Sequence, residues 1–376
     1  MAKKLRVGIV FGGKSGEHEV SLRSAASILN AIDRKKYDVV PIGISKEGRW
    51  LQSEEAQQLL GSGAPKKINA TNSTGLSIHA AAAGTEAAKL DVIFPVLHGT
   101  FGEDGTIQGL FELADIAYVG SGVLGSSAGM DKDAMKRMFA ASKLPMVKHV
   151  TLLRSEWKKS AKKCVAQIEA ALKYPLFVKP ANLGSSVGIS KVKTRKDLAP
   201  AMDLAAQFDR KIVIEQGVGG AGNARLTGKA RELEVAVLGN DFPEASVVGE
   251  IVPDREFYDY ESKYDASSTS EPVIPAKMTR EQSKQIREMA IRAFQACDCS
   301  GLARVDFLME PASKSGRAPR IYLNEINTMP GFTSISMYPK LWEASGVGYS
   351  QLIDRLITLA LERHAEKKQT SFTRGA

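Results

Sequence analysis

The sequence predicts an α/β protein of several domains, and its first region shows why. Residues 5–11 are β-branched and apolar and end in a Gly-rich turn, which is typical of a buried strand. A helix-like spacing of apolar residues follows over 25–32, and residues 39–44 form a second apolar run. Strand, helix and strand in this order predict a parallel sheet. With 376 residues, the chain is long enough for two or three domains.

The first predicted domain, residues 1–128, continues the same alternation. Residues 53–75 are small and polar and predict a loop, and the alanine-rich residues 79–89 predict a helix. The other elements expected in this domain are a strand at 91–97, a helix at 106–114 and a strand at 118–122.

Two further domains are predicted, at residues 129–217 and 218–376. The second opens with a basic stretch at 131–163, several of whose lysines we expect on a solvated helix face. Its other elements are strands at 176–179 and 187–192, a helix at 197–207 and a strand at 211–215. The third domain has strands at 232–238, 302–309 and 320–327, a helix that starts at Thr279 with Gln282 in a capping box, and a helix at 349–364.

Composition excludes several classes of protein. Three cysteines are too few for a disulfide scaffold, and no apolar run approaches the roughly 20 residues of a membrane helix. No secretory apolar segment follows the N-terminal lysines, so we expect a cytoplasmic protein without a membrane partner.

The balance of charge points to an anionic partner or to a generally basic surface. The chain has 51 Lys and Arg residues against 42 Asp and Glu residues, a formal charge of +9. Aromatic residues are not interleaved with the basic stretch at 131–163 in the way that base stacking requires. We therefore expect no nucleic-acid partner.

The N-terminal turn matches a phosphate-binding pattern that does not fit it physically. Gly8 to Ser15 (GIVFGGKS) has the spacing G-x-x-x-x-G-K-[ST]. The residues that would cradle phosphate belong to the strand, so we interpret the segment as a flexible turn at the strand's carboxyl end, where open α/β sheets bind ligands. Glu19 follows at the helix start, where it either favours the helix N-terminus or holds a ligand ammonium.

A second Gly-rich loop joins the strands at 176–179 and 187–192. Lys179 ends the first of them, and Gly184, Ser185 and Ser186 follow. Such a loop offers backbone N–H groups and hydroxyls to nucleotide phosphates, with the lysine as a point charge. A plain Gly-Ser hairpin is the alternative.

Four polar residues of the strands at 302–309 and 320–327 are predicted to share a face. The strand period of two puts Arg304 beside Asp306, and Glu325 beside Asn327. Two carboxylates and an amide oxygen suit Mg²⁺, which also takes phosphate oxygens and water. A salt bridge between the guanidinium and a carboxylate is the alternative.

Three further features are ambiguous by themselves. Residues 257–264 are rich in tyrosine and lie in a long polar loop, which indicates either a lid or a surface loop. His98 ends a strand, where it is either structural or a ligand contact. Cys297 and Cys299 have no second pair of ligands, so packing explains them better than a metal site.

Together these segments resemble D-alanine–D-alanine ligases of the ATP-grasp superfamily. The resemblance covers about residues 5–363 in collinear order. It rests on GGKSGEHEVS at the N-terminus, FPVLHGTFGEDGTIQG at 94–109, MDK at 130–132, VKPANLGSSVG at 178–188, FYDYESKY at 257–264, GLARVDF at 301–307 and LNEINTMPGFTSIS at 323–336. It implies the ATP-grasp fold, in which an N-terminal parallel α/β domain is followed by two α+β domains that clamp ATP.

The resemblance implies roles for individual residues. Glu19 would bind the ammonium of the first D-alanine, held by Ser185 and Tyr264, and His98 would lie near that substrate's carboxylate. The expected oxyanion site is Arg304 with the Gly331 N–H, and Ser336 would bind the second D-alanine's carboxylate. The expected ATP contacts are Lys132, Lys179, Ser186, Glu215, Val218, Glu232 and Lys263. The expected metal ligands are Asp306, Glu325 and Asn327.

The resemblance also implies the reaction. An ATP-dependent enzyme of this family makes D-alanyl-D-alanine for peptidoglycan through an acyl phosphate, with two Mg²⁺ or Mn²⁺ ions, and we expect a homodimer. Relatives that make D-alanyl-D-lactate lack the tyrosine matching Tyr264, so its presence favours the dipeptide over D-alanyl-D-lactate or D-alanyl-D-serine. One departure from the family pattern is an insertion at 219–230, which adjoins Val218.

Overall fold

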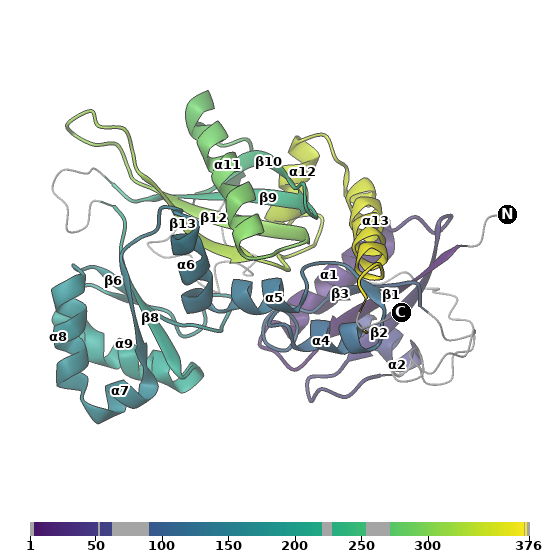
Figure 1. Ribbon diagram of the computed structural model, residues 1–376, viewed down its shortest axis with the longest axis horizontal. Coiled ribbons are helices and arrows are strands. Elements are labelled where there is room, and N and C mark those ends of the chain that lie inside the picture. The colour runs from purple at the N-terminus through teal and green to yellow at the C-terminus, as the bar shows by residue number, and fades with distance from the viewer. Residues whose placement is uncertain are drawn as a thin grey trace.

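The computed structural model describes residues 4–51, 53–61, 90–219, 228–252, 271–371 and 373. Within these residues the strands form three sheets. Figure 1 shows the N-terminal sheet and the central sheet at opposite ends of the molecule, with the C-terminal sheet between and above them. No helix in the described ranges combines the length and apolar character that crossing a bilayer needs.

The N-terminal sheet is parallel, with the strand order β2-β1-β3-β4. Its elements are β1 (Leu5–Gly12), α1 (His18–Ala31), β2 (Tyr37–Ile44), α2 (Ser53–Leu60), β3 (Val92–Val96), α4 (Thr106–Leu113) and β4 (Ala117–Tyr118). The loop expected at 53–75 is wrong at its start, because α2 buries Ala56 close to Gly43 of β2. Residues 62–89, including the helix expected at 79–89, lie outside the described residues.

The central sheet is antiparallel, with the order β5-β8-β6-β7. The elements of this region are α5 (Val123–Met130), α6 (Lys132–Ala141), β5 (His149–Leu153), α7 (Arg154–Lys159), α8 (Ala161–Ala171), β6 (Leu176–Pro180), β7 (Ser190–Val192), α9 (Arg195–Phe208) and β8 (Lys211–Gln216). The sheet and α7, α8 and α9 bury a core of their own, between Leu152 and Ile214 in the sequence, whereas Met135 and Phe139 of α6 pack in the core of the C-terminal sheet. In the basic stretch, the lysines of α7 and the start of α8 are exposed as expected, but Lys132 and Lys136 of α6 are buried.

The C-terminal sheet is antiparallel, with the order β11-β10-β9-β12-β13. Its elements are β9 (Arg231–Gly239), β10 (Glu244–Val252), β11 (Glu271–Val273), α11 (Arg280–Ala296), β12 (Gly301–Met309), β13 (Ile321–Asn327), α12 (Met337–Ala344) and α13 (Tyr349–Lys367). The capping box at the start of α11 is confirmed, since the Thr279 hydroxyl accepts from the Gln282 N–H and the Thr279 N–H donates to the Gln282 side chain.

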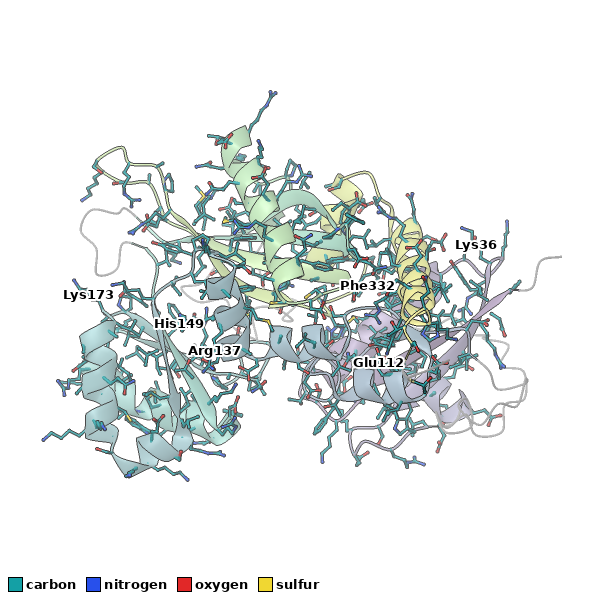
Figure 2. The ribbon with its side chains drawn as sticks, in the orientation of Figure 1. Lys36, Glu112, Arg137, His149, Lys173 and Phe332 are labelled. Atoms are coloured by element: carbon teal, nitrogen blue, oxygen red, sulfur yellow. The ribbon has the colours of Figure 1, made fainter. Side chains whose placement is uncertain are left out.

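One apolar core joins the N-terminal sheet to the C-terminal helices. It contains residues of β1 and β3 together with residues of β9, α12 and α13. Phe332 lies in this core, fully buried, with its ring centroid 5.7 Å from that of Phe94 on β3. Figure 2 labels Phe332 where α13 meets the N-terminal sheet. The loop that carries Phe332 is therefore fixed against both parts of the molecule.

Candidate active site

At the end of β1 the backbone passes so close to the end of β2 that only glycine fits. Gly12 has φ +91°, and a β-carbon there would lie 2.1 Å from the Ile44 carbonyl oxygen. Ile9, Val10 and Phe11 are buried residues of β1, so they form no phosphate cradle. The interpretation of this segment as a turn at the strand's carboxyl end is confirmed.

Glu17, and not Glu19, points into the site. The Glu17 carboxylate accepts a hydrogen bond from the Ser185 hydroxyl. A β-carbon on Gly99 or Gly184 would lie 2.7 or 2.9 Å from Glu17 Oε2, so these glycines give the carboxylate its room. Glu19 is 60% exposed and pairs with Lys46 at 2.7 Å.

The position expected for Glu19 is therefore corrected. The hydrogen bond from Lys46 lowers the pKa of Glu19 at the surface. Side chains two residues apart on a helix start point to opposite sides, so only one of the two glutamates can face Ser185. The sequence shows both carboxylates at the helix start, and nothing in their spacing tells which one faces inward.

Glu103 is a second carboxylate of the site that sequence reasoning missed. Its Oε1 accepts the Gly99 N–H at 2.6 Å. Burial, together with the negative charge of Glu17, raises the pKa of Glu103 to about 8. Glu103 therefore carries a proton near neutral pH. The clustering of Glu103 with His98 in one motif was the available signal.

His98 is buried among protein groups. Its Nδ1 lies 3.0 Å from the Met329 carbonyl oxygen and its Nε2 lies 3.1 Å from the Ser24 hydroxyl. Burial lowers the pKa of His98, so the ring is neutral. Both ring nitrogens are thus occupied by protein groups, the Met329 carbonyl and the Ser24 hydroxyl.

The loop between β6 and β7 connects the central sheet to this turn. Ser185 and Ser186 have φ angles of 50° and 60°, which are rare for residues other than glycine. The Lys132 ammonium donates to the Leu183 carbonyl oxygen at 2.8 Å and lies 3.9 Å from Glu325 Oε2. Burial lowers the pKa of Lys132. This lysine therefore joins the loop to the Glu325 carboxylate of β13.

Glu215 is held between two lysines in the interior. Its Oε1 lies 2.7 Å from the Lys136 ammonium, and its Oε2 lies 2.6 Å from that of Lys179. Burial alone would raise the pKa of Glu215, but the two cations lower it well below its usual range. The same carboxylate, with Glu325, raises the pKa of Lys179 against the opposing effect of burial. Lys136 is fully buried and was missed, because the basic stretch around it suggested a solvated face.

A row of carboxylates crosses three strands of the C-terminal sheet. Glu234 of β9, Asp306 of β12 and Glu325 of β13 are paired in register. Arg304 lies 3.0 Å from Glu234 and makes two hydrogen bonds of 2.7 and 2.8 Å with Asp306. Asn327 donates to Asp306 at 3.0 Å. The predicted shared face of Arg304, Asp306, Glu325 and Asn327 is confirmed, and Glu234 was missed.

A β-bulge gives Glu325 its direction. Asp306 pairs with Glu325 while Phe307 pairs with Leu323, so Asn324 is the extra residue. The bulge lets Leu323 and Ile326 both face the core while Glu325 stays on the polar face. Leu323 and Ile326 are three residues apart, so strict alternation would have turned one of these two side chains away from the core.

The donor set at this face suits a divalent cation. Asp306 and Glu325 are carboxylates placed opposite each other, with Arg304 beside the first and Lys132 near the second. Asn327 adds an amide whose oxygen is a hard ligand, as Mg²⁺ and Mn²⁺ prefer. In the described part of the chain, no group of three or more His, Cys, Asp and Glu side chains is placed to hold a metal by itself. The remaining ligands would be phosphate oxygens and water.

The loop after β13 brings two predicted residues together. A β-carbon on Gly331 would lie 3.2 Å from Ser336 Oγ, so the glycine and the hydroxyl are neighbours. Ser336 stands at the N-terminus of α12 and accepts the Thr333 N–H at 3.1 Å.

The remaining predicted residues lie at the end of β8, on β9 or beyond the described ranges. Val218 and Glu232 are half-buried, one after the end of β8 and the other on β9. A bridge between Gly219 and Lys229 closes the base of the insertion. Lys263 and Tyr264, with the whole of 257–264, lie outside the described residues.

The chain is similar along its whole length to known proteins. Family profiles described as "D-ala D-ala ligase N-terminus" and "D-ala D-ala ligase C-terminus" match residues 6–121 and 138–358. D-alanine–D-alanine ligases from Geobacillus thermodenitrificans and Geobacillus kaustophilus are each 49% identical over 98% of this chain and cover 99% and 98% of their own lengths.

Two solved structures have the same fold. The D-alanine–D-alanine ligase from Coxiella burnetii is 33% identical, with a TM-score of 0.77 over 98% of this chain and 97% of its own. The VanG D-Ala:D-Ser ligase from Enterococcus faecalis is 36% identical, also with a TM-score of 0.77, over 95% of this chain and 100% of its own. Both are therefore similar to this chain throughout.

Proposed function

The chain belongs to the D-alanine–D-alanine ligase family, and from this premise we propose how its residues perform the reaction. It has the ATP-grasp fold and is an ATP-dependent ligase that joins two D-alanines into D-alanyl-D-alanine for peptidoglycan. An amine does not attack a carboxylate without activation. The first D-alanine carboxylate therefore takes the γ-phosphoryl group of ATP and releases ADP. The amine of the second D-alanine then attacks the carbonyl carbon of this acyl phosphate, and inorganic phosphate leaves.

Glu17 binds the ammonium of the first D-alanine, in the role first expected of Glu19. The hydrogen bond between Ser185 and Glu17 is the observation that carries this proposal, because it brings the substrate turn and the phosphate loop together. Glu103 keeps its proton, so one carboxylate faces one ammonium. Tyr264, which lies outside the described residues, is the third residue proposed for this role, with Glu17 and Ser185.

Lys132 and Lys179 contact the phosphates of ATP. The Lys132 ammonium is held at the loop between β6 and β7 and that of Lys179 at Glu215, which supports two cations near the transferred group in this proposal. The other proposed ATP contacts are Ser186 and Lys263 at the phosphates, Glu215 and Val218 at the adenine, and Glu232 at the ribose. When ATP binds, the Glu215 carboxylate would contact the adenine as well as Lys136 and Lys179.

Asp306, Glu325 and Asn327 would hold two Mg²⁺ or Mn²⁺ ions, which when bound offset the charge that develops on the phosphoryl group. Arg304 is directed toward the same face by Glu234 and Asp306. With the Gly331 N–H it stabilises the oxyanion formed when the second amine attacks. Ser336, beside Gly331, binds the second D-alanine's carboxylate.

The wider organisation follows the same proposal. The three sheets support domains at 1–128, 129–217 and 218–376. The use of ATP supports a location in the cytoplasm, and the homodimer rests on the family resemblance.

The test is ADP release measured in parallel with D-alanine, L-alanine, D-serine and D-lactate. We expect release with D-alanine alone and none with L-alanine alone. Release with D-alanine plus D-lactate, but not with D-alanine alone, would overturn the proposed product. The D-serine arm separates this chain from a ligase of the kind that the VanG name describes.

A further inference from the structure

Ser24 is a fully buried residue of α1 that the proposed reaction does not use. Its hydroxyl lies 3.1 Å from His98 Nε2, and the Phe332 N–H donates to the same oxygen at 3.4 Å. One position of the first helix thus contacts the end of β3 and the loop after β13.

The contacts around this hydroxyl fix the place of each proton. The Met329 carbonyl can only accept, so the neutral His98 ring carries its proton on Nδ1. His98 Nε2 is then an acceptor, and the Ser24 hydroxyl must donate to it. The serine oxygen retains lone pairs, one of which accepts the Phe332 N–H. Every group in the Ser24–His98 pair is satisfied by this arrangement alone.

This pair holds a short backbone segment at both of its ends. Met329 is held by its carbonyl and Phe332 by its N–H, and Gly331 lies between them. Pro330, also between them, has no N–H to donate. The Phe332 ring is anchored against Phe94, so the segment cannot shift as a whole without opening the core.

We propose that Ser24 and His98 are positioning residues that aim the Gly331 N–H at the oxyanion of the tetrahedral intermediate. They act through the backbone of 329–332 and touch neither substrate. This inference rests on the oxyanion role proposed for Gly331.

The first test replaces Ser24 by alanine and measures binding of a phosphinate dipeptide analogue. Its tetrahedral phosphorus oxygen takes the place of the oxyanion, so its Ki reports the aim of the donor. We expect the Ki of Ser24→Ala to rise about tenfold or more, because a full loss of one such donor costs about 10²–10³ in rate. The KM values for ATP and for the first D-alanine should change less than about threefold.

Ser126→Ala is the matched control, since Ser126 is as buried as Ser24 and its hydroxyl also makes a buried hydrogen bond, to the Ser121 carbonyl oxygen. The free energy of unfolding, measured with urea, is compared for both variants. If both lose similar stability and neither changes the Ki, Ser24 is only structural and the inference is overturned.

The second test removes the two hydrogen bonds of His98 one at a time. His98→Asn keeps a donor near the Nδ1 position, and His98→Gln keeps an acceptor near the Nε2 position. Each breaks one half of the arrangement, so both should raise the Ki and leave the KM for the first D-alanine nearly unchanged. A raised KM for D-alanine with an unchanged Ki would show that His98 contacts substrate, against the inference.

Arg304→Lys separates this inference from the proposed function. A raised Ki in Arg304→Lys with an unchanged Ki in Ser24→Ala would overturn the role of Ser24 and keep the oxyanion site. An unchanged Ki in both variants would overturn the oxyanion site itself and the inference with it.

Discussion

The Ser185 hydroxyl donates a hydrogen bond to the Glu17 carboxylate, joining the loop between β6 and β7 to the N-terminal turn. Ser185 holds a left-handed backbone conformation while it does so, and Gly99 and Gly184 leave room for the carboxylate. The loop between β6 and β7 and the turn after β1 are therefore connected through two side chains.

Glu17→Gln should lower kcat/KM for D-alanine about 100-fold, because a charged partner of the substrate ammonium is lost. Glu19→Gln is the matched control and should remain near the wild type, since Glu19 is exposed and paired with Lys46. ADP release at varied D-alanine concentration checks both. The opposite ranking of the two variants would return the role to Glu19.

Lys136→Met should destabilise the protein by about 3 kcal/mol, because it removes one of the two cations that hold a buried carboxylate. The KM for ATP should rise as well, since Glu215 and Lys179 lose their support. Arg137→Met is the control: Arg137, labelled in Figure 2, is 76% exposed, and its pair with Asp133 should be worth less than about 0.5 kcal/mol. Urea unfolding measures both, and equal losses would contradict the account of Lys136.

Asp306→Asn should raise the Mg²⁺ concentration needed for half-maximal activity about tenfold or more, because one of two facing carboxylates is removed. Added Mg²⁺ should raise the unfolding temperature of the wild type more than that of the variant. Glu244→Gln removes an exposed carboxylate of the same sheet and serves as the control. A Mg²⁺ requirement unchanged in Asp306→Asn would argue against metal at this face.

Glu103 should make the protein less stable as pH rises. Its pKa is raised from an ordinary value of 4.5 to about 8, so the folded protein keeps a proton that the unfolded chain loses between these values. Stability is therefore lost progressively from about pH 4.5 to about pH 8. Glu103→Gln should show a smaller decline in its urea midpoint over this range than the wild type or Glu19→Gln does. Parallel declines in all three proteins would contradict the raised pKa.

The polar face of the C-terminal sheet could be predicted from the sequence because strand alternation is a local property. Arg304 and Asp306 are two residues apart, and Val305 and Phe307 are apolar, so the face follows from spacing alone. The bulge at Asn324 could not be predicted in this way, because it depends on how β13 pairs with β12. The cap at Thr279 is local too, and it was found.

Residues whose partners are distant in sequence were the ones that sequence reasoning missed. Lys136 belongs to a basic stretch, and only its contact with Glu215 explains its burial. Ser24 gains its meaning from His98 and Phe332, which lie in other parts of the chain. Glu17 and Glu19 differ only in which of them the helix turns toward Ser185. Local pattern determines the elements, and long-range packing decides which polar side chains of those elements meet.

The core shared by the N-terminal sheet and the C-terminal helices also bears on how the chain is made. Its members run from Val7 to Ala360, so nearly the whole chain must be synthesised before that core can form completely. The core of the central sheet, from Leu152 to Ile214, is complete much earlier. The first strands to emerge are thus covered only in part, by α1 and α2, until the chain is nearly complete. A nascent chain that stops short of α13 leaves exposed the part of the N-terminal sheet that α13 packs against.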